Sequence, residues 1–150
     1  MAGKYFDELE VGQTFKHQPG RTITEADNVF FSCLTMNPQP LHVDFHAASK
    51  AEFGRPLVNS IFTLGLVIGM TVGDTTLGTT VANLGMSDVR FPKPVFHGDT
   101  IHARTTVVAT RRSKSRSDAG IIEFEHVGLN QRGEEVAICR RAALMKIKPV

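Results

Sequence analysis

Residues 60–73, SIFTLGLVIGMTVG, are the most apolar stretch of this 150-residue chain and decide its fold class. A helix without a polar face is usually buried on all sides, so we expect a central helix inside the protein. Gly65 and Gly69, four residues apart, predict a smooth stripe on this helix where a sheet can approach closely. The stretch is well short of the ~20 residues that a membrane span needs.

The second half of the chain has the alternating pattern of β-strands. Residues 100–107 place Ile, Ala, Thr and Val at every second position, which predicts a strand buried on one face. Residues 121–129 and 135–147 predict two more strands, joined by a turn at residues 130–133. A buried helix followed by antiparallel strands is an α+β layout. We therefore expect a single α+β domain, residues 1–150, with a sheet wrapped around the central helix.

Two helices are predicted ahead of the central one. The first can begin with a capping box at Thr22 or at Thr24, and the second covers residues 45–53 and closes at Gly54. The apolar residues of the first helix recur with the spacing of one buried face, at Ala26, Val29, Phe30, Cys33 and Leu34.

Composition argues against several classes of function. The formal net charge is only +2, which gives no reason to expect a nucleic-acid partner. Cys33 and Cys139 match no zinc or CxxC spacing, so no metal site is expected, and so few cysteines fit a reducing compartment. Residues 1–9 lack the apolar core of a signal peptide. We therefore expect a cytoplasmic protein with no membrane partner.

Residues 35–44, TMNPQPLHVD, are the segment that carries chemistry. Pro38 and Pro40 stiffen the backbone on either side of Gln39, and His42 follows them, so we interpret the segment as a positioned loop. A histidine held in this way can act as a general acid or base near neutral pH. It can equally cap the second helix or hydrogen-bond a loop carbonyl, and the residues alone leave both interpretations open.

Three segments resemble motifs of the MaoC-like dehydratases and (R)-specific enoyl-CoA hydratases. Residues 35–44 resemble the motif S/T-G-D-x-N-P-L/I-H-x-D, and residues 56–66, PLVNSIFTLGL, resemble P-I-A-H-G-x-x-T-x-x-L at the start of the central helix. Residues 89–100, VRFPKPVFHGDT, resemble V-x-F-x-x-P-V-x-x-G-D-T. The resemblance implies a hotdog fold and a hydro-lyase that adds water to an enoyl-CoA thioester or removes it from a 3-hydroxyacyl-CoA.

The first motif departs from the family at its catalytic pair. His42 matches the histidine and Met36 the glycine, but Asn37 stands where the family has an aspartate that activates water with the histidine. An amide accepts no proton and has no useful pKa. The resemblance then implies that His42 is the titrating catalyst and that Asn37 orients the water. Alternatively, Asp44 or another carboxylate replaces the aspartate, or activity is lost.

The resemblance also implies a substrate site around the start of the central helix. The family's oxyanion-binding backbone N–H falls on Ser60, where the helix dipole favours negative charge, although Asn59 or Ser60 can also be a plain N-cap. Arg55 is a candidate partner for a free carboxylate, because FGRPLVNS resembles the segment of mesaconyl- and itaconyl-CoA hydratases. A solvated arginine is the plainer interpretation. Gln39, in place of the family's asparagine, keeps an amide beside the substrate.

Four basic residues are candidates to bind the CoA phosphates, namely Arg90, Lys93, Arg112 and Lys114. The last two lie in RRSKSRS, residues 111–117, which reads as an exposed loop between two strands, and a solvated hairpin is the plainer interpretation. CoA is part of the substrate, and we expect no separate cofactor.

Two other functions stay open. A hotdog acyl-CoA thioesterase usually relies on a carboxylate at the start of the central helix, where this chain has Asn59 and Ser60. A non-catalytic acyl-CoA-binding subunit is the second alternative, and Asn37 would then mark lost activity. A hotdog monomer leaves an edge strand open, so we expect a homodimer or higher homo-oligomer, with the site at the interface as in the family.

Overall fold

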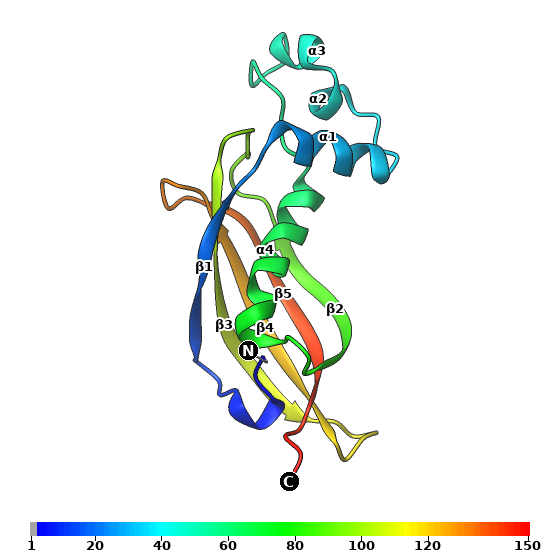
Figure 1. Cartoon of the computed structure of the whole chain (residues 1–150), viewed down its shortest axis with the longest axis vertical. Helices are drawn as coiled ribbons and strands as arrows, with labels where there is room; N and C mark the ends of the chain where they lie inside the picture. Colours follow the sequence, from blue (N-terminus) through cyan, green and yellow to red (C-terminus); the bar gives the residue numbers. More distant parts are fainter. Residues whose placement is uncertain (1–2) are drawn as a thin grey trace.

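A computed structural model describes residues 3–150 and shows a five-stranded antiparallel sheet curved around one long helix (Figure 1). The sheet order is β1-β3-β4-β5-β2, so β1 and β2 are its edges. In chain order the elements are η1 (Phe6–Glu8), β1 (Thr14–Thr22), α1 (Glu25–Leu34), α2 (Pro40–Val43), α3 (Phe45–Ser49), α4 (Ser60–Thr75), β2 (Thr80–Arg90), β3 (Thr100–Arg112), β4 (Ala119–Leu129) and β5 (Glu135–Lys146).

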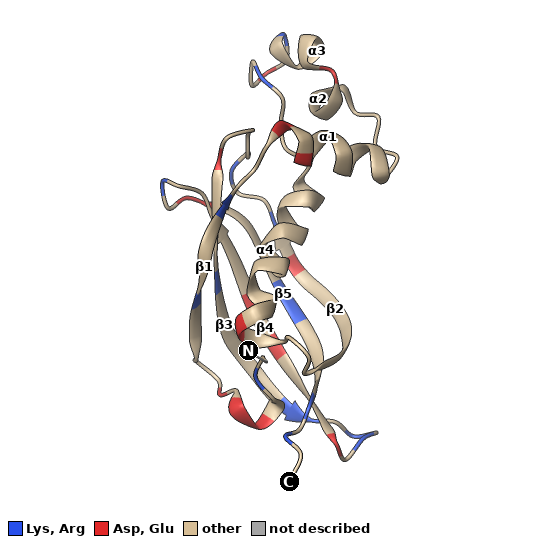
Figure 2. Cartoon of the chain, viewed as in Figure 1, with Lys and Arg blue, Asp and Glu red and all other residues tan. Residues whose placement is uncertain are grey.

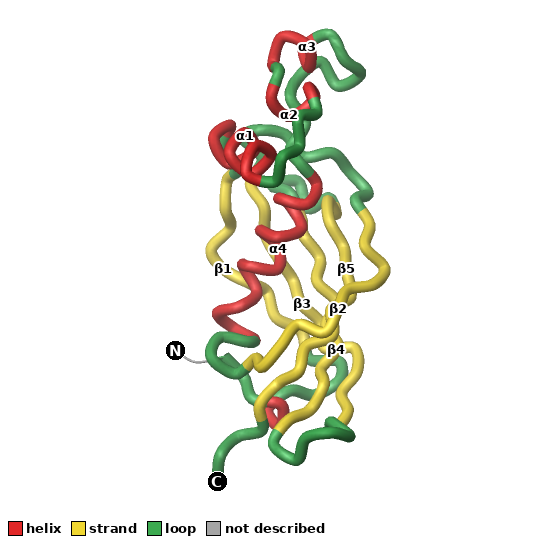
Figure 3. The backbone as a smooth tube through the Cα atoms, turned by 90° about the vertical axis from the view of Figure 1, so that its right-hand side faces the viewer, coloured by secondary structure: helices red, strands yellow, loops and turns green. Residues whose placement is uncertain are grey.

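The predicted hotdog arrangement is present, with α4 lying along the concave face of the sheet (Figures 1 and 3). The three helices α1, α2 and α3 gather at the end where α4 begins, and the β3–β4 hairpin lies at the opposite end. The predicted strands are confirmed, and β3 alternates between buried and half-exposed positions from residue 100 to residue 107. In the described part of the chain, no helix is long and apolar enough to cross a membrane.

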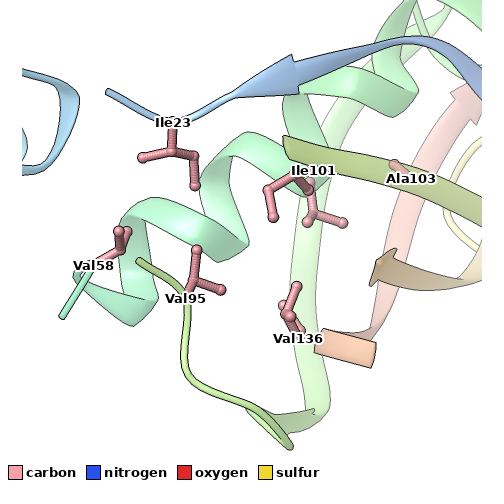
Figure 4. Packing of buried hydrophobic residues seen from close by; sticks show 8 residues of the cluster. Ile23, Val58, Val95, Ile101, Ala103 and Val136 are labelled. Carbon is pink, nitrogen blue, oxygen red and sulfur yellow. The ribbon is translucent and has the colours of Figure 1, made fainter. Parts of the chain in front are cut away.

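The core forms where the first half of α4 meets the sheet (Figure 4). Each large aliphatic side chain that becomes fully buried stabilises the fold by about 1.5–3 kcal/mol. The buried cluster consists of Ile23, Val58, Val67, Val95, Ile101, Ala103, Val136 and Ala137.

The prediction that α4 is buried on all sides is wrong. The helix buries Leu64 and Val67 toward the sheet, but Gly65 and Gly69 are exposed and no neighbouring atom lies within 4 Å of an added Cβ. The sheet instead approaches closely at its own Gly128, where a Cβ would lie 2.4 Å from Val67 Cγ2. A sheet covers only one side of a helix, so the glycine stripe faces away from it.

The start of α1 agrees with one of the two predicted caps. Thr24 is the N-cap, and its Oγ1 accepts a hydrogen bond of 3.3 Å from the backbone N–H of Asp27, whereas Thr22 ends strand β1. The second predicted helix is shorter than expected, because α3 ends at Ser49 and turns lead on to Gly54, which has φ +66°.

The predicted buried face of α1 is wrong. Phe30 and Leu34 are 68% and 83% exposed, while Asn28 and Ser32 are fully buried. The spacing of apolar residues shows only which face of a helix is apolar. It does not detect polar side chains that are buried because they have hydrogen-bond partners elsewhere in the fold. The buried face of α1 is therefore the polar one, and it faces the site described below.

Candidate active site

His42 is held by the carbonyl of Leu57. It lies on α2, a single turn with Gln39 as N-cap and a proline at its first position, and its Nδ1 is 2.7 Å from Leu57 O. A carbonyl only accepts hydrogen bonds, so Nδ1 donates, and in the neutral ring Nε2 then has the lone pair. The loop-carbonyl contact is thus present, and it leaves the second ring nitrogen able to take a proton.

The start of α4 lies next to Leu57 along the chain. Asn59 is the N-cap, and its Oδ1 accepts a hydrogen bond of 3.0 Å from Ile61 N. The backbone N–H of Ser60 has no hydrogen-bond acceptor within residues 3–150. A free N–H at the positive end of a helix can bind an oxyanion. Capping and anion binding therefore use different donors here.

Ser60 and Leu57 line one hollow, which is mostly apolar and has a single cationic side chain, Lys93. Apolar walls with few polar groups are typical of sites for small organic ligands. The other lining residues are Phe53, Val58, Thr63, Phe91, Pro92, Pro94, Val95 and Val136.

Asn28 is a polar residue of this region that the sequence analysis missed. Its Nδ2 donates to Leu57 O at 3.0 Å, and its Oδ1 accepts from Asn59 N at 2.8 Å. The same Nδ2 lies 3.0 Å from Nε2 of His97, so that nitrogen accepts. Burial lowers the pKa of His97, against the opposing charge of Glu25, which fits a neutral ring that accepts. The signal in the sequence is the pair of polar residues at 28 and 32, four apart within an apolar helix.

Asn37 lies on the loop between α1 and α2. Its Oδ1 accepts a hydrogen bond of 3.1 Å from Gln39 N, and Asn37 lines one shallow hollow together with Asn59. Met36 has φ +56°, in the left-handed region that favours the glycine found there in the motif. Within residues 3–150 no hydrogen bond joins Asn37 to His42. Asn37 on the loop and His42 on α2 are therefore close in sequence but are not paired.

Asp44 is engaged elsewhere. Its Oδ1 accepts a hydrogen bond of 2.9 Å from Ala47 N and so caps α3. A carboxylate that caps a helix is held by backbone donors. The structure thus assigns Asp44 a structural contact and gives no support to the idea that it replaces the aspartate of the motif.

The basic candidates are spread over the molecule. The guanidinium of Arg55 lies 3.6 Å from the ring centroid of Phe96, in the segment before α4. Lys93 is 3.8 Å from Glu134, and Arg90 is the last residue of β2. Figure 2 shows that the hairpin between β3 and β4, which carries Arg112 and Lys114, lies at the end opposite α2. Within one chain the structure therefore separates that pair from His42.

The chain matches a known family along most of its length. The family described as "MaoC like domain" matches residues 7–128. The chain belongs to the MaoC-like domain family. Two enzymes with curated names and one solved structure show how far this similarity extends.

The mesaconyl-CoA hydratase of Cereibacter sphaeroides is 33% identical over 135 residues, which are 90% of this chain and 39% of that protein. The (R)-specific enoyl-CoA hydratase of Aeromonas caviae is 34% identical over 106 residues, covering 71% of this chain and 76% of that protein. A structure described as a monoamine oxidase regulatory protein from Archaeoglobus fulgius has a TM-score of 0.87 at 32% identity, with 99% of this chain and 98% of that one covered. The MaoC-like chain is thus much shorter than the first of these relatives.

Proposed function

We propose that this MaoC-like chain adds water to an enoyl-CoA thioester and removes it from a 3-hydroxyacyl-CoA. The observation that carries the proposal is the hydrogen bond of 2.7 Å between His42 Nδ1 and Leu57 O. Leu57 lies three residues before Ser60, whose N–H has no acceptor within residues 3–150. This pairing leaves a basic nitrogen and an oxyanion donor on adjoining segments. The two named relatives that are hydratases support the same chemistry.

The reaction needs one proton acceptor and one anion site. In hydration, Nε2 of His42 takes a proton from water while the water oxygen bonds to the β-carbon. The electron pair of the double bond moves to the thioester oxygen, which Ser60 N–H stabilises as an enolate. Nε2 then returns the proton to the α-carbon, so atoms balance and the ring ends neutral. The amide of Asn37 orients the water and transfers no proton.

A hydration assay on crotonyl-, mesaconyl- and itaconyl-CoA tests this function. His42→Ala should lower kcat by about 100-fold or more, because it removes the group that moves the proton. His46→Ala is the matched control, since His46 is exposed on α3 and its Nε2 contacts Lys50. Unchanged turnover in His42→Ala would remove that residue from the chemistry.

The substitution at the aspartate position gives a companion measurement. Asn37→Asp restores the carboxylate of the family motif, and turnover of crotonyl-CoA should rise because a second proton acceptor becomes available. A loss of activity would show that the amide is required as it stands.

The same assay separates the alternatives. A thioesterase would release free CoA thiol. Such an enzyme usually has a carboxylate at the start of the central helix, where this chain has the amide of Asn59, which caps the helix. An acyl-CoA-binding subunit would bind the panel without turning over any member. We favour hydration because His42 is held in the tautomer that a base requires.

We also propose that two copies associate through β2. Among residues 3–150 this edge strand pairs only with β5, and four of its exposed side chains are apolar, namely Val81, Leu84, Met86 and Val89. Exposed Ile61 and the glycine stripe of α4 lie on the face that the sheet leaves uncovered. An unpaired apolar edge of this kind suits a second identical edge.

Free cysteines at 33 and 139 fit the expected cytoplasmic location in acyl-CoA metabolism.

A further inference from the structure

The three residues just before the start of α4, residues 57–59, are held by one buried side chain. Asn28 is fully buried on α1, and it bonds Leu57 O through Nδ2 at 3.0 Å and Asn59 N through Oδ1 at 2.8 Å. We infer that Asn28 is the positioning residue of the site: it sets the geometry between the His42 base and the Ser60 N–H donor. The inference rests on the proposed hydratase function.

The amide of Asn28 takes the place of a neighbouring strand. In a parallel ladder, one residue accepts from N–H of residue i+2 and donates to C=O of residue i on the facing strand. Asn28 makes this pair of bonds to Asn59 and Leu57 across Val58. On the other side, Val58 N donates to Val95 O at 2.8 Å. The segment 57–59 is therefore fixed from both sides, without belonging to the sheet.

Both functional groups depend on this segment. Leu57 O accepts from Asn28 and from His42 Nδ1, so the direction of that carbonyl sets the ring orientation and the tautomer. Asn59 N, held by Asn28, is one peptide before Ser60 N. A shift of about 1 Å in either group is enough to lower a rate about 100-fold. Asn28 thus acts on the reaction through groups that it holds, without touching the substrate.

The orientation of the Asn28 amide is itself determined. Leu57 O can only accept and Asn59 N can only donate, which places Nδ2 and Oδ1 without ambiguity. The second hydrogen of Nδ2 faces Nε2 of His97 at 3.0 Å, and the ring of Phe45 packs 5.5 Å from the His97 ring. Both Nδ2 and Oδ1 therefore have hydrogen-bond partners. A 180° flip of the amide would place its oxygen against Leu57 O and its NH₂ group against Asn59 N–H.

The test reads the His42 ring in the substrate-free protein. Two-bond ¹⁵N–¹H spectra of histidine-labelled protein distinguish Nδ1–H from Nε2–H tautomers, with His42→Gln identifying the signal. Wild type should show Nδ1–H at His42, and Asn28→Ala should show exchange between both tautomers. In the hydration assay the same variant should lose about 10- to 100-fold in kcat with KM changed less than about threefold.

Two further variants keep the test decisive. Asn28→Asp preserves volume and the acceptor for Asn59 N but sets an oxygen against Leu57 O, so it should share the kcat loss. Asn130→Ala removes another buried amide, which bonds backbone N–H groups of the β4–β5 turn, and should leave kcat and the His42 spectrum unchanged.

Both Asn28 variants showing the wild-type tautomer and wild-type kcat would overturn the inference. Because the spectra need no substrate, they judge the role of Asn28 even if wild type hydrates none of the thioesters. That last result would count against the proposed function alone.

Discussion

His42 and Leu57 form the contact on which the proposed chemistry depends. The imidazole donates from Nδ1 to a backbone carbonyl, so its basic nitrogen is selected by a neighbour that cannot ionise. In the family motif an aspartate assists the histidine, and here Asn37 keeps the shape of that residue without its charge. In the proposed mechanism, the hydrogen bond to this carbonyl orients the ring, and Asn37 adds no charge to assist it.

Arg55 gives a prediction about substrate choice. Its guanidinium stacks on Phe96 at 3.6 Å, which fixes the plane while its N–H edges stay available to a free carboxylate. Arg55→Ala should lower kcat/KM for mesaconyl-CoA by about 10- to 100-fold, the cost of one hydrogen-bonded charge pair, and should leave crotonyl-CoA within about threefold.

Lys50→Ala is the control for Arg55, because it removes an exposed cation of the same region at the end of α3. Its kcat/KM should match wild type for both thioesters. Equal losses on the two substrates in Arg55→Ala would show that the arginine supports the fold of the segment and does not read the acyl group.

At the scale of the elements, one close approach between α4 and the sheet lies at a glycine of β4. A Cβ at Gly128 of β4 would lie 2.4 Å from Cγ2 of Val67, which is buried and has no room to move. Gly128→Ala should therefore lower the free energy of unfolding by about 1–3 kcal/mol, the usual cost of overpacking. Chemical denaturation measures this difference.

Gly73→Ala serves as the opposite case on α4. No atom lies within 4 Å of a Cβ added there, so alanine brings only its better helix propensity. Its free energy of unfolding should be equal to that of wild type or higher by up to about 1 kcal/mol. A destabilised Gly73→Ala together with a neutral Gly128→Ala would reverse our assignment of the packed and open faces of the helix.

A row of buried polar side chains crosses the sheet below α4. Arg141 Nε donates to His126 Nε2 at 3.1 Å, so His126 Nδ1 donates to Thr105 Oγ1 at 2.8 Å. The hydroxyl of Thr105 then donates to His17 Nε2 at 2.8 Å, and His17 Nδ1 donates to Asp74 Oδ2 at 2.7 Å. Each donor meets an acceptor only while both histidines are neutral at the nitrogens that accept. The row therefore ties four strands to the end of α4.

This row makes stability depend on pH. Burial, with the charges of Arg141 and His17, lowers the pKa of His126 to about 3. The unfolded chain takes up this proton near the ordinary histidine pKa, so stability from this group is present above roughly pH 6.5 and is lost as pH falls toward 3. Between roughly pH 6.5 and roughly pH 5 the loss is about 2 kcal/mol.

His126→Gln removes the titrating group while keeping an amide that can accept from Arg141. Its free energy of unfolding, measured by denaturant at both pH values, should fall less than that of wild type by about 2 kcal/mol. Asp74, His17 and His97 are unchanged in the variant. Identical pH slopes in the two proteins would show that His126 does not set the acid sensitivity.

At the scale of the whole molecule, the open edge of the sheet predicts a dimer. Leu84 is half exposed on β2, and a charge there would be desolvated if a second copy covered the strand. Leu84→Arg should change the mass measured by sedimentation from two chains to one, with loss of hydration activity if the site needs both chains. Val11→Arg, at an exposed apolar residue outside β2, should leave the mass unchanged.

The local pattern was enough to predict the family, the long apolar helix and the buried alternation of residues 100–107, and it gave Thr24 as one of two possible caps. Each of these depends on side chains within a few positions of one another, and periodicity and motif spacing record such neighbours directly. The motif also identified His42 as the candidate base, and the structure places it on the single turn α2, which begins at Pro40.

Only the tertiary structure decided which face of α1 is buried, where the glycines of α4 point, and what holds His42. The buried face of α1 depends on Leu57, Asn59 and His97, which lie 29 to 69 positions from Asn28 along the chain. The direction of the α4 glycines depends on which side of the helix the sheet covers. Burial of a polar group is favourable only when partners arrive from other elements, and a one-dimensional pattern of polarity carries no record of them.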